Sequence, residues 1–184
     1  TPLLFCANKK HTNMACELNI GFGLDCKDGI GGIKKIVLTD FTNVDAFTLD
    51  ADEVVTAIIA NDAQEIYTYE LPTQTGSFEE TINFNRDAGT IFYTQTVNVM
   101  LNKLSAAKRL ELQNVATARV IVFVNDSNDN WWAVGYEYGA DLSTATAATG
   151  TVLGDMNGFT LAFTHETAKR AYKLINSPSA IITD

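Results

Sequence analysis

The sequence predicts a mainly β protein, built as an antiparallel β-sandwich or barrel with one flanking α-helix and one long hairpin. Three observations lead to this prediction. Apolar and polar residues alternate with a period of two over most of the chain from Ile33 onward, as they do in strands with one buried and one solvated face. A single stretch has the composition of a helix, and one strand–turn–strand segment is longer than usual.

The length and composition indicate one domain with an irregular start. The chain has 184 residues, of which 46% are hydrophobic and 19% charged, which is typical of a globular domain. We expect this domain over residues 33–176, after an irregular N-terminal arm over 1–32 and before a C-terminal tail over 177–184. The arm ends in Gly29-Ile30-Gly31-Gly32, which favours a flexible joint. It could reach a neighbouring molecule or be a loosely packed terminus.

The long hairpin consists of two runs on either side of a turn. Over residues 77–85, Phe78, Ile82 and Phe84 share one face, which we expect to be buried, and polar residues share the other. The second run extends from Ile91 to Leu101 with the same alternation. Arms of roughly ten residues reach about 30 Å, which favours a ribbon that joins a larger shared sheet.

The helix is predicted over residues 105–116. Ser105 is a candidate N-cap, and the following residues are mainly Ala, Lys, Arg, Leu, Glu and Gln. Leu112 and Val115 lie on one side, whereas Leu110 projects nearly opposite. We therefore expect this helix to contact two bodies.

The remaining strands follow the helix. Val120–Val124 is apolar on both faces, as a central strand would be, and residues 131–138 return after a turn. The Thr-rich, nearly chargeless stretch Gly139–Gly158 is either a long connection or an extended edge segment. Two further strands are predicted, one around Phe159, Leu161 and Phe163 and a short one near Tyr172–Ile175.

The charge balance excludes a protein that grips nucleic acid. The chain has 13 Lys and Arg against 22 Asp and Glu, a formal charge of −9, which is opposite in sign to a phosphate-neutralising surface. No run of eighteen apolar residues is present, so we expect neither a membrane span nor an export signal.

The cysteines and histidines do not assemble into a catalytic or metal site. Cys6, Cys16 and Cys26 are odd in number, which favours free thiols in a reducing cytoplasm. Zinc binding would need further ligands, and only His11 is near. A nucleophile needs a base and an orienting group, and the second histidine, His165, is expected to be a solvated loop residue. We therefore predict no enzyme, no metal and no cofactor.

Two polar segments resemble ligand-binding motifs without meeting their requirements. Asp126–Asn130, with Glu137 at the twelfth position, echoes a calcium loop, but Trp131 stands where Gly is needed and the flanks are strands. A polar hairpin turn explains it more simply. The adjacent Glu79 and Glu80 point to opposite faces of a strand, so we expect them to serve solubility rather than acid–base chemistry.

The adjacent tryptophans suggest one alternative function. Trp131 and Trp132 point to opposite faces, so one is expected in the core and the other at a surface or an interface. An exposed indole can stack on a sugar ring. A β-sandwich carbohydrate-binding module is therefore the alternative from a different class.

Several segments of the sequence together resemble those of a known class of proteins. They are Gly29-Ile30-Gly31-Gly32-Ile33-Lys34-Lys35-Ile36, the strand–turn–strand from Gly76 to Leu104, the helix after Ser105, and Ala147-Ala148-Thr149-Gly150-Thr151-Val152-Leu153-Gly154-Asp155 before Gly158-Phe159-Thr160-Leu161. Together they resemble virion structural proteins of tailed bacteriophages and prophages of Bacteroidetes, crAss-like phages included, of tail-tube or tail-ring type. The resemblance covers roughly residues 29–164. The arm before it and the stretch Thr164–Asp184 match nothing in that class.

The resemblance implies a β-sandwich or barrel of tail-tube type and a non-enzymatic role. Copies would form a homo-oligomeric ring or tube in the virion tail after synthesis in the bacterial host cytoplasm. Other tail or connector proteins would be the partners, DNA would pass through without specific binding, and neither a membrane nor a small-molecule substrate would be involved. A head-to-tail connector or capsid-associated virion protein is the close alternative. We expect the subunit interface to include Phe92, Leu110, Thr149, Gly150 and Leu153.

Overall fold

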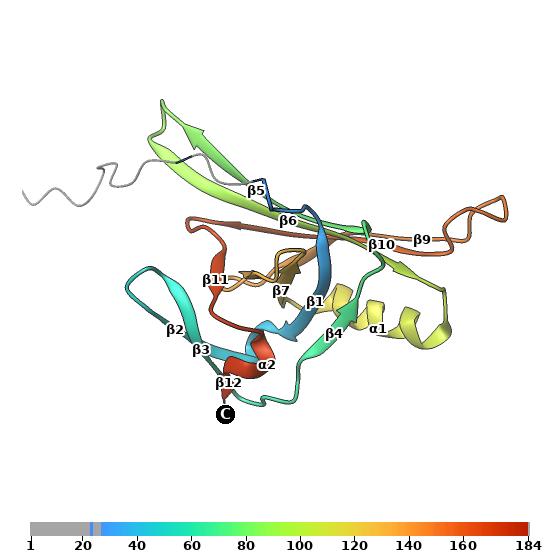
Figure 1. Cartoon of the computed structure of the whole chain (residues 1–184), viewed down its shortest axis with the longest axis horizontal. Helices are drawn as coiled ribbons and strands as arrows, with labels where there is room; N and C mark the ends of the chain where they lie inside the picture. Colours follow the sequence, from blue (N-terminus) through green and yellow to red (C-terminus); the bar gives the residue numbers. More distant parts are fainter. Residues whose placement is uncertain (1–22, 24–26, 184) are drawn as a thin grey trace, which may run out of the picture.

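The computed structural model describes residue 23 and residues 27–183 and confirms the mainly β fold class. Strands make up 53% of the structure and helical residues 12%, and the strands form two sheets that do not close into a barrel. The larger sheet and the single long helix lie on one side of the smaller sheet, whose β9–β10 loop end projects beyond them and whose β5–β6 hairpin tip rises away from them (Figure 1).

The larger sheet has eight strands and contains the centre of the fold. Its strand order is β12-β3-β11-β8-β7-β1-β4, with β2 also paired to β3; the pairs of β3 with β11 and β12 are parallel and the others antiparallel. The strands are β1 (Ile33–Asp40), β2 (Val44–Leu49), β3 (Val54–Ala60), β4 (Tyr67–Glu70), β7 (Val120–Asp126), β8 (Trp131–Val134), β11 (Tyr172–Leu174) and β12 (Ile182–Thr183). The 3-10 helix η1 (Phe41–Asn43) connects β1 to β2, and the short helix α2 (Pro178–Ile181) precedes β12.

The central position of β7 is confirmed. Residues Val120–Val124 are all buried, although their side chains point alternately to the two faces of the sheet. An all-apolar run needs cover on both faces, and β7 has it because it lies between β1 and β8 with a hydrophobic cluster on either side.

The smaller sheet has four antiparallel strands in the order β5-β6-β10-β9. The predicted hairpin forms β5 (Gly76–Asn85) and β6 (Thr90–Asn102). The strand around Phe159 is β10 (Gly158–Thr167). The Thr-rich stretch supplies the edge strand β9 (Asp141–Ala148) and, over residues 149–157, the connection to β10, so each of the two interpretations holds for part of it.

Two hydrophobic clusters hold the fold together. The first lies between the two sheets and takes Val97, Val99, Phe159, Leu161 and Phe163 from the inner face of the smaller sheet. The second includes residues of β1, β3, β7, β8 and β11, all strands of the larger sheet. These strands are neighbours in the sheet, so their side chains form a continuous apolar face, and Phe47 of β2 lies against Phe123 and Tyr172 of that face.

The helix is confirmed as α1 (Ala106–Thr117). The Ser105 hydroxyl accepts a hydrogen bond from the Lys108 amide, as expected of an N-cap. Leu112 and Val115 are buried against the first cluster, whereas Leu110 is 62% exposed. The predicted orientation of Leu110 is thus confirmed.

The expected burial of the outer hairpin is wrong. Phe78 packs against the first cluster, but Ile82 is 55% and Phe84 77% exposed. The alternation of the strand is as predicted, yet the tip of the hairpin rises away from the larger sheet (Figure 1), so nothing in the described chain covers this part of the inner face.

Candidate functional site

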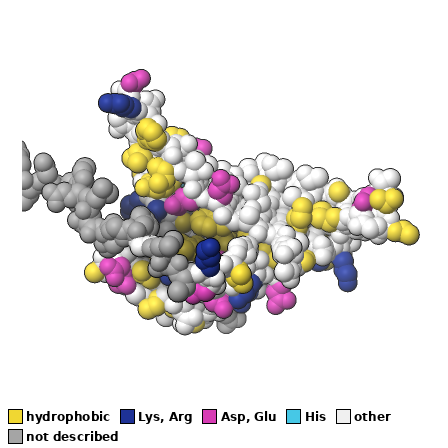
Figure 2. All heavy atoms as spheres, turned by 45° about the horizontal axis from the view of Figure 1, so that its top comes forward, with side chains coloured by type: hydrophobic (Ala, Val, Ile, Leu, Met, Phe, Trp, Pro, Cys, Tyr) yellow, Lys and Arg dark blue, Asp and Glu magenta, His cyan; other side chains and the backbone are white. Residues whose placement is uncertain are grey.

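The most distinctive surface is the outer face of the four-stranded sheet. None of β5, β6, β9 and β10 contains a Lys or Arg. The side chains that point away from the core are mainly Thr, Asn and Ser, with the carboxylates of Glu79 and Glu166 and two exposed apolar residues, Phe92 and Met100. Figure 2 shows that the surface between the two projecting ends is mostly polar and uncharged. This face is therefore a broad polar wall without cations.

Both edges of the same sheet are open among the described residues. β5 pairs with β6 alone, and β9 pairs with β10 alone. Every side chain of β9 except Leu142 is exposed, and its only charge is Asp141 at its start. Unpaired edges offer rows of backbone donors and acceptors, and proteins that avoid pairing usually protect them with Lys, Pro or bulges. β9 carries neither Lys nor Pro, and its one irregularity is a bulge at Ser143 near its start, so the edge from Thr144 to Ala148 is regular.

One end of the sheet is the tip of the β5–β6 hairpin, which carries an exposed apolar face. Ile82 and Phe84 on β5 lie opposite Tyr93 and Ile91 on β6, so all four side chains lie on one face. Ile82, Phe84 and Ile91 are each more than half exposed. In Figure 2 hydrophobic side chains gather on the projection at the upper left.

The other end is the loop between β9 and β10, residues 149–157, which presents Val152 and Leu153 to solvent. The carboxylate of Asp155 accepts hydrogen bonds from the backbone amides of Thr151 (2.7 Å) and Val152 (2.9 Å). These bonds hold the pKa of Asp155 below its usual value. Gly150 has a positive φ of 70°, and a Cβ there would lie 2.2 Å from Cβ of Asp155. The loop is thus a defined turn.

All five predicted interface residues lie on the surface, but not in one patch. Thr149, Gly150 and Leu153 belong to the β9–β10 loop, Leu110 to α1, and Phe92 to the outer face of the hairpin. The sequence interpretation missed Ile82, Phe84 and Ile91 because their alternation suggested a core face. The length of the hairpin was the signal that they lie beyond the core.

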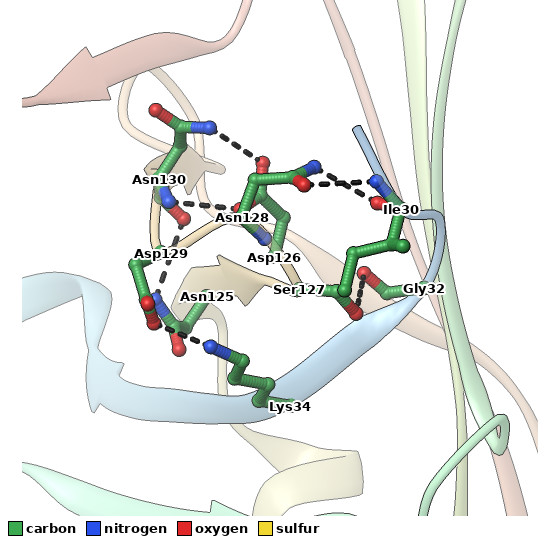
Figure 3. A network of polar contacts seen from close by, with 9 residues as sticks. All are labelled: Ile30, Gly32, Lys34, Asn125, Asp126, Ser127, Asn128, Asp129 and Asn130. Carbon is green, nitrogen blue, oxygen red and sulfur yellow. Dashed lines mark hydrogen bonds and ion pairs between the residues drawn. The ribbon is translucent and has the colours of Figure 1, made fainter. Parts of the chain in front are cut away.

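The calcium-like segment forms a turn that holds the end of the N-terminal arm (Figure 3). The Asp126 carboxylate accepts hydrogen bonds from Asn128 and Asn130 within the turn. The Asn128 side chain bonds both the amide and the carbonyl of Ile30, at 2.9 and 2.8 Å. Ser127 donates twice to the Gly32 carbonyl. The expected flexible joint is therefore tied to the β7–β8 turn.

His165 is not the solvated loop residue that the sequence suggested. It lies inside β10 and is 4% exposed, because it continues the buried alternation of Phe159, Leu161 and Phe163. Its Nδ1 lies 2.9 Å from the carbonyl oxygen of Gly139. Since a carbonyl only accepts, Nδ1 is the donor. Burial lowers the pKa of His165, although Glu137, Asp141 and Glu166 act in the opposite direction.

Glu80 also differs from the expectation of a solubilising residue. It is half-buried, and its Oε2 accepts hydrogen bonds from Gln95 Nε2 (3.1 Å) and from the backbone amide of Ala171 (2.6 Å). It thereby joins the four-stranded sheet to the segment that leads into β11. Of the two, only Glu79, on the opposite face, is exposed as predicted.

Both tryptophans are engaged within the fold. Trp131 is 7% exposed in the second cluster, with Lys35 Nζ 5.3 Å from the centre of its ring. Trp132 is half-buried against the first cluster and lies 6.4 Å from Phe78, ring centre to ring centre. The sequence predicted one tryptophan in the core, as Trp131 is, and the other at a surface or an interface. Because Trp132 is half-buried against the first cluster, neither ring offers an open face to a sugar.

A cavity of about 400 Å³ lies between β4, the end of β6 and the start of α1. Two of its polar groups are used within the chain: Tyr69 donates to Glu111 (3.0 Å), and Lys108 Nζ donates to the Asn102 carbonyl (2.8 Å). Burial and the neighbouring Glu111 raise the pKa of Tyr69. These internal pairs favour a structural role for the groups in this cavity.

The remaining candidates give no chemical centre. Cys6, Cys16, Cys26 and His11 lie outside the described residues. Within the described part of the chain, no three His, Cys, Asp or Glu side chains group as metal ligands would. No helix among the described residues is long and apolar enough to cross a membrane.

Comparison with known proteins found no matching family model and no matching curated protein. The function of the chain must therefore be argued from its surfaces: a cation-free wall, two open sheet edges and two apolar ends.

Proposed function

We propose that this chain is a non-enzymatic structural protein of a phage virion, and that copies of it form a ring or tube in the tail through which the genome passes. The protein would be made in the host cytoplasm and act in the virion. The resemblance of residues 29–164 to tail-tube and tail-ring proteins suggests this role, and the surfaces of the four-stranded sheet support it.

The main support for a genome conduit is the absence of Lys and Arg from all four strands of this sheet. Duplex DNA presents a negative charge about every 1.7 Å along its axis, and Lys or Arg on a wall would bind these phosphates. A wall of Thr, Asn and Ser with carboxylates such as Glu79 and Glu166 repels them weakly and offers no fixed binding point. Such a surface suits a conduit.

The two open edges suggest how the wall closes. β5 and β9 lie at opposite edges of one sheet, so pairing β9 of one copy with β5 of the next uses two different surfaces. Contacts of this heterologous kind form a closed ring when the rotation between copies closes. Each junction would satisfy edge donors and acceptors, and the four-stranded sheets would join into one continuous wall.

These surfaces bear differently on the two alternative functions. A head-to-tail connector or capsid-associated protein would use the same wall and edges, and only its position in the virion distinguishes it. A carbohydrate-binding module would need an exposed indole, and Trp131 and Trp132 pack against the two hydrophobic clusters instead.

Negative-stain electron microscopy over a concentration series, with mass from light scattering, tests the ring. We expect rings or tubes with a central hole. Ala147→Pro on β9 should prevent assembly, because the Ala147 amide faces the open edge and proline cannot donate to a partner strand, whereas Ala147→Val at the same exposed position should assemble normally. Thermal unfolding checks that both variants keep the fold. A monomer of about 20 kDa at every concentration would contradict the ring.

A second variant tests the conduit. Thr96 and Thr164 are cross-strand neighbours on the outer face. We expect wild-type rings not to retain duplex DNA at low salt, and the double variant Thr96→Lys/Thr164→Lys to gain salt-dependent DNA binding. Equal, strong DNA binding by both proteins would contradict a passive wall.

A further inference from the structure

We propose that copies of this chain also associate end to end, so that the hairpin end of one molecule meets the β9–β10 loop end of the next. This inference rests on the proposed ring and adds the contact that would turn rings into a tube. The partner is a second copy of the same chain, and the two ends are complementary in both apolar character and charge.

The hairpin end carries the apolar half of the contact. Ile82, Phe84 and Ile91 continue the inner face of the sheet beyond the point where the larger sheet covers it. Exposed side chains of this size on one face of a projecting ribbon are unusual on a monomer and mark a surface that another molecule covers.

The same end of the molecule also carries net negative charge: the exposed Arg86 and Asp87 of the hairpin turn balance each other, and the excess comes from a neighbouring turn. The turn between β2 and β3 lies at the hairpin end of the long axis (Figure 1) and contains Asp50, Asp52 and Glu53, all exposed. Asp50 Oδ1 accepts hydrogen bonds from the amides of Asp52 and Val54, both at 2.9 Å, so the turn is well defined. Glu53 forms an exposed ion pair with Arg170 at 3.1 Å, which leaves a net negative turn.

The opposite end has an apolar loop of its own. Val152 and Leu153 lie at the tip of the β9–β10 loop, and Leu153 is fully exposed. The hydrogen bonds from Thr151 and Val152 to Asp155 fix the turn that presents them. Because this loop is already ordered, covering its apolar tip costs little conformational entropy.

Net positive charge lies at this loop end, where three cations outnumber the exposed Asp155 carboxylate of the loop. Lys103 precedes α1, and Lys108 and Arg109 lie in its first turns; all three are exposed. Figure 1 shows the start of α1 at the same end of the long axis as the β9–β10 loop. The positive end of the helix dipole adds to these charges. This group stands out on a chain whose formal charge is −9.

The arrangement of these four features fits a simple shift along the long axis. In Figure 1 the hairpin tip lies above the acidic turn at one end, and the loop tip lies above the start of α1 at the other. Moving one copy by a molecular length therefore brings apolar tip to apolar loop and carboxylates to ammonium and guanidinium groups. A contact that repeats by translation is heterologous and continues into a stack. Opposite charges at its rim orient the copies.

Charge reversal tests the electrostatic half. Asp52→Lys/Glu53→Lys should shorten the stacks seen by electron microscopy and raise the concentration needed for end-to-end association roughly tenfold, the size expected for a few reversed exposed pairs. Lys108→Glu/Arg109→Glu should do the same. A chain with all four changes should recover stacking, since attraction returns with the signs exchanged. Without recovery, the two patches do not meet.

Matched hairpin variants test the apolar half. Phe84→Ser should reduce stacking, whereas Phe92→Ser, on the opposite face of the same hairpin, should not. Equal effects of both would overturn the assigned face. If Phe84→Ser abolishes binding to anionic vesicles of phosphatidylglycerol and phosphatidylcholine but leaves stacking unchanged, the tip meets lipid rather than a second copy.

The experiments separate this inference from the ring. Ala147→Pro acts on lateral pairing, and the charge-reversed variants act on stacking. Single rings in wild type that never stack, or stacks indifferent to all these changes, overturn the end-to-end contact and leave the ring standing. Linear chains without closed rings would overturn the ring and keep the end-to-end contact.

Discussion

The two sheets of this protein use their faces in opposite ways. In the larger sheet, β7 has a hydrophobic cluster on each face, and its five residues from Val120 to Val124 are buried. In the smaller sheet only the inner face contributes to a core, and the outer face, both edges and both ends remain exposed. The difference indicates that the larger sheet stabilises the molecule, whereas the smaller one is available to other molecules.

A pair of phenylalanine variants gives the largest expected contrast between the two sheets. Phe123 is fully buried in β7, and Phe84 is 77% exposed at the tip of β5. Phe123→Ala should lower the free energy of unfolding by about 3–5 kcal/mol, from lost burial and the cavity left behind. Phe84→Ala should change it by less than about 0.5 kcal/mol, as exposed positions do. Urea denaturation of the monomer measures both.

Equal destabilisation by the two phenylalanine variants would also be informative. If Phe84→Ala destabilised the monomer as much as Phe123→Ala, the hairpin tip would be packed in the isolated chain. The hairpin tip would then belong to the core, as the middle of the smaller sheet does, and it would not be free for a second copy.

The connection between the two sheets gives the next effect. Glu80 accepts hydrogen bonds from Gln95 and from the Ala171 amide, which precedes β11 of the larger sheet. Removing a half-buried acceptor leaves these donors unpaired, so Glu80→Ala should cost about 1.5–3 kcal/mol. Glu79→Ala, one residue away on the solvated face, should be close to neutral. Equal costs would show that the hydrogen bonds of Glu80 do not couple the sheets.

The elements that could be predicted from the sequence are those with local sequence signals. The alternation from Ser77 to Leu101 predicted the hairpin, the Ser105 cap and the following helix formers predicted α1, and the unbroken apolar run Val120–Val124 predicted a central strand. Each of these depends on periodicity or capping within a few residues, which tertiary packing did not overrule.

The remaining features depend on distances between segments far apart in sequence. The periodicity of Ile82 and Phe84 is that of a core face, and only the extent of the larger sheet leaves them exposed. Glu80 has a role because Ala171 lies beside it, 91 residues later. The calcium-like motif is a tether because Ile30 lies against Asn128. No local pattern contains this information.

His165 gives the smallest expected effect, and it tests the region where the two sheets meet. Its ring lies on the inner face of the smaller sheet, and Nδ1 donates to the Gly139 carbonyl that follows β8. Burial lowers its pKa in the folded protein below the ordinary value near 6.5. The unfolded chain therefore binds a proton more readily, and the neutral ring contributes stability that is present above about pH 6.5 and is lost as the pH falls toward the folded-state pKa.

The pH dependence of unfolding can isolate this residue. We expect wild type to lose stability between pH 7.5 and 5.5, with a slope from His165 of at most about 1.4 kcal/mol per pH unit. His165→Gln, which cannot titrate, should be less stable at pH 7.5 but should lack this part of the slope, while the carboxylates of Glu137, Asp141 and Glu166 remain in both proteins. Urea denaturation at the two pH values measures the difference. Identical slopes would mean that His165 is as solvated in the folded protein as in the unfolded chain, so that the inner face of the smaller sheet opens where it meets the larger one.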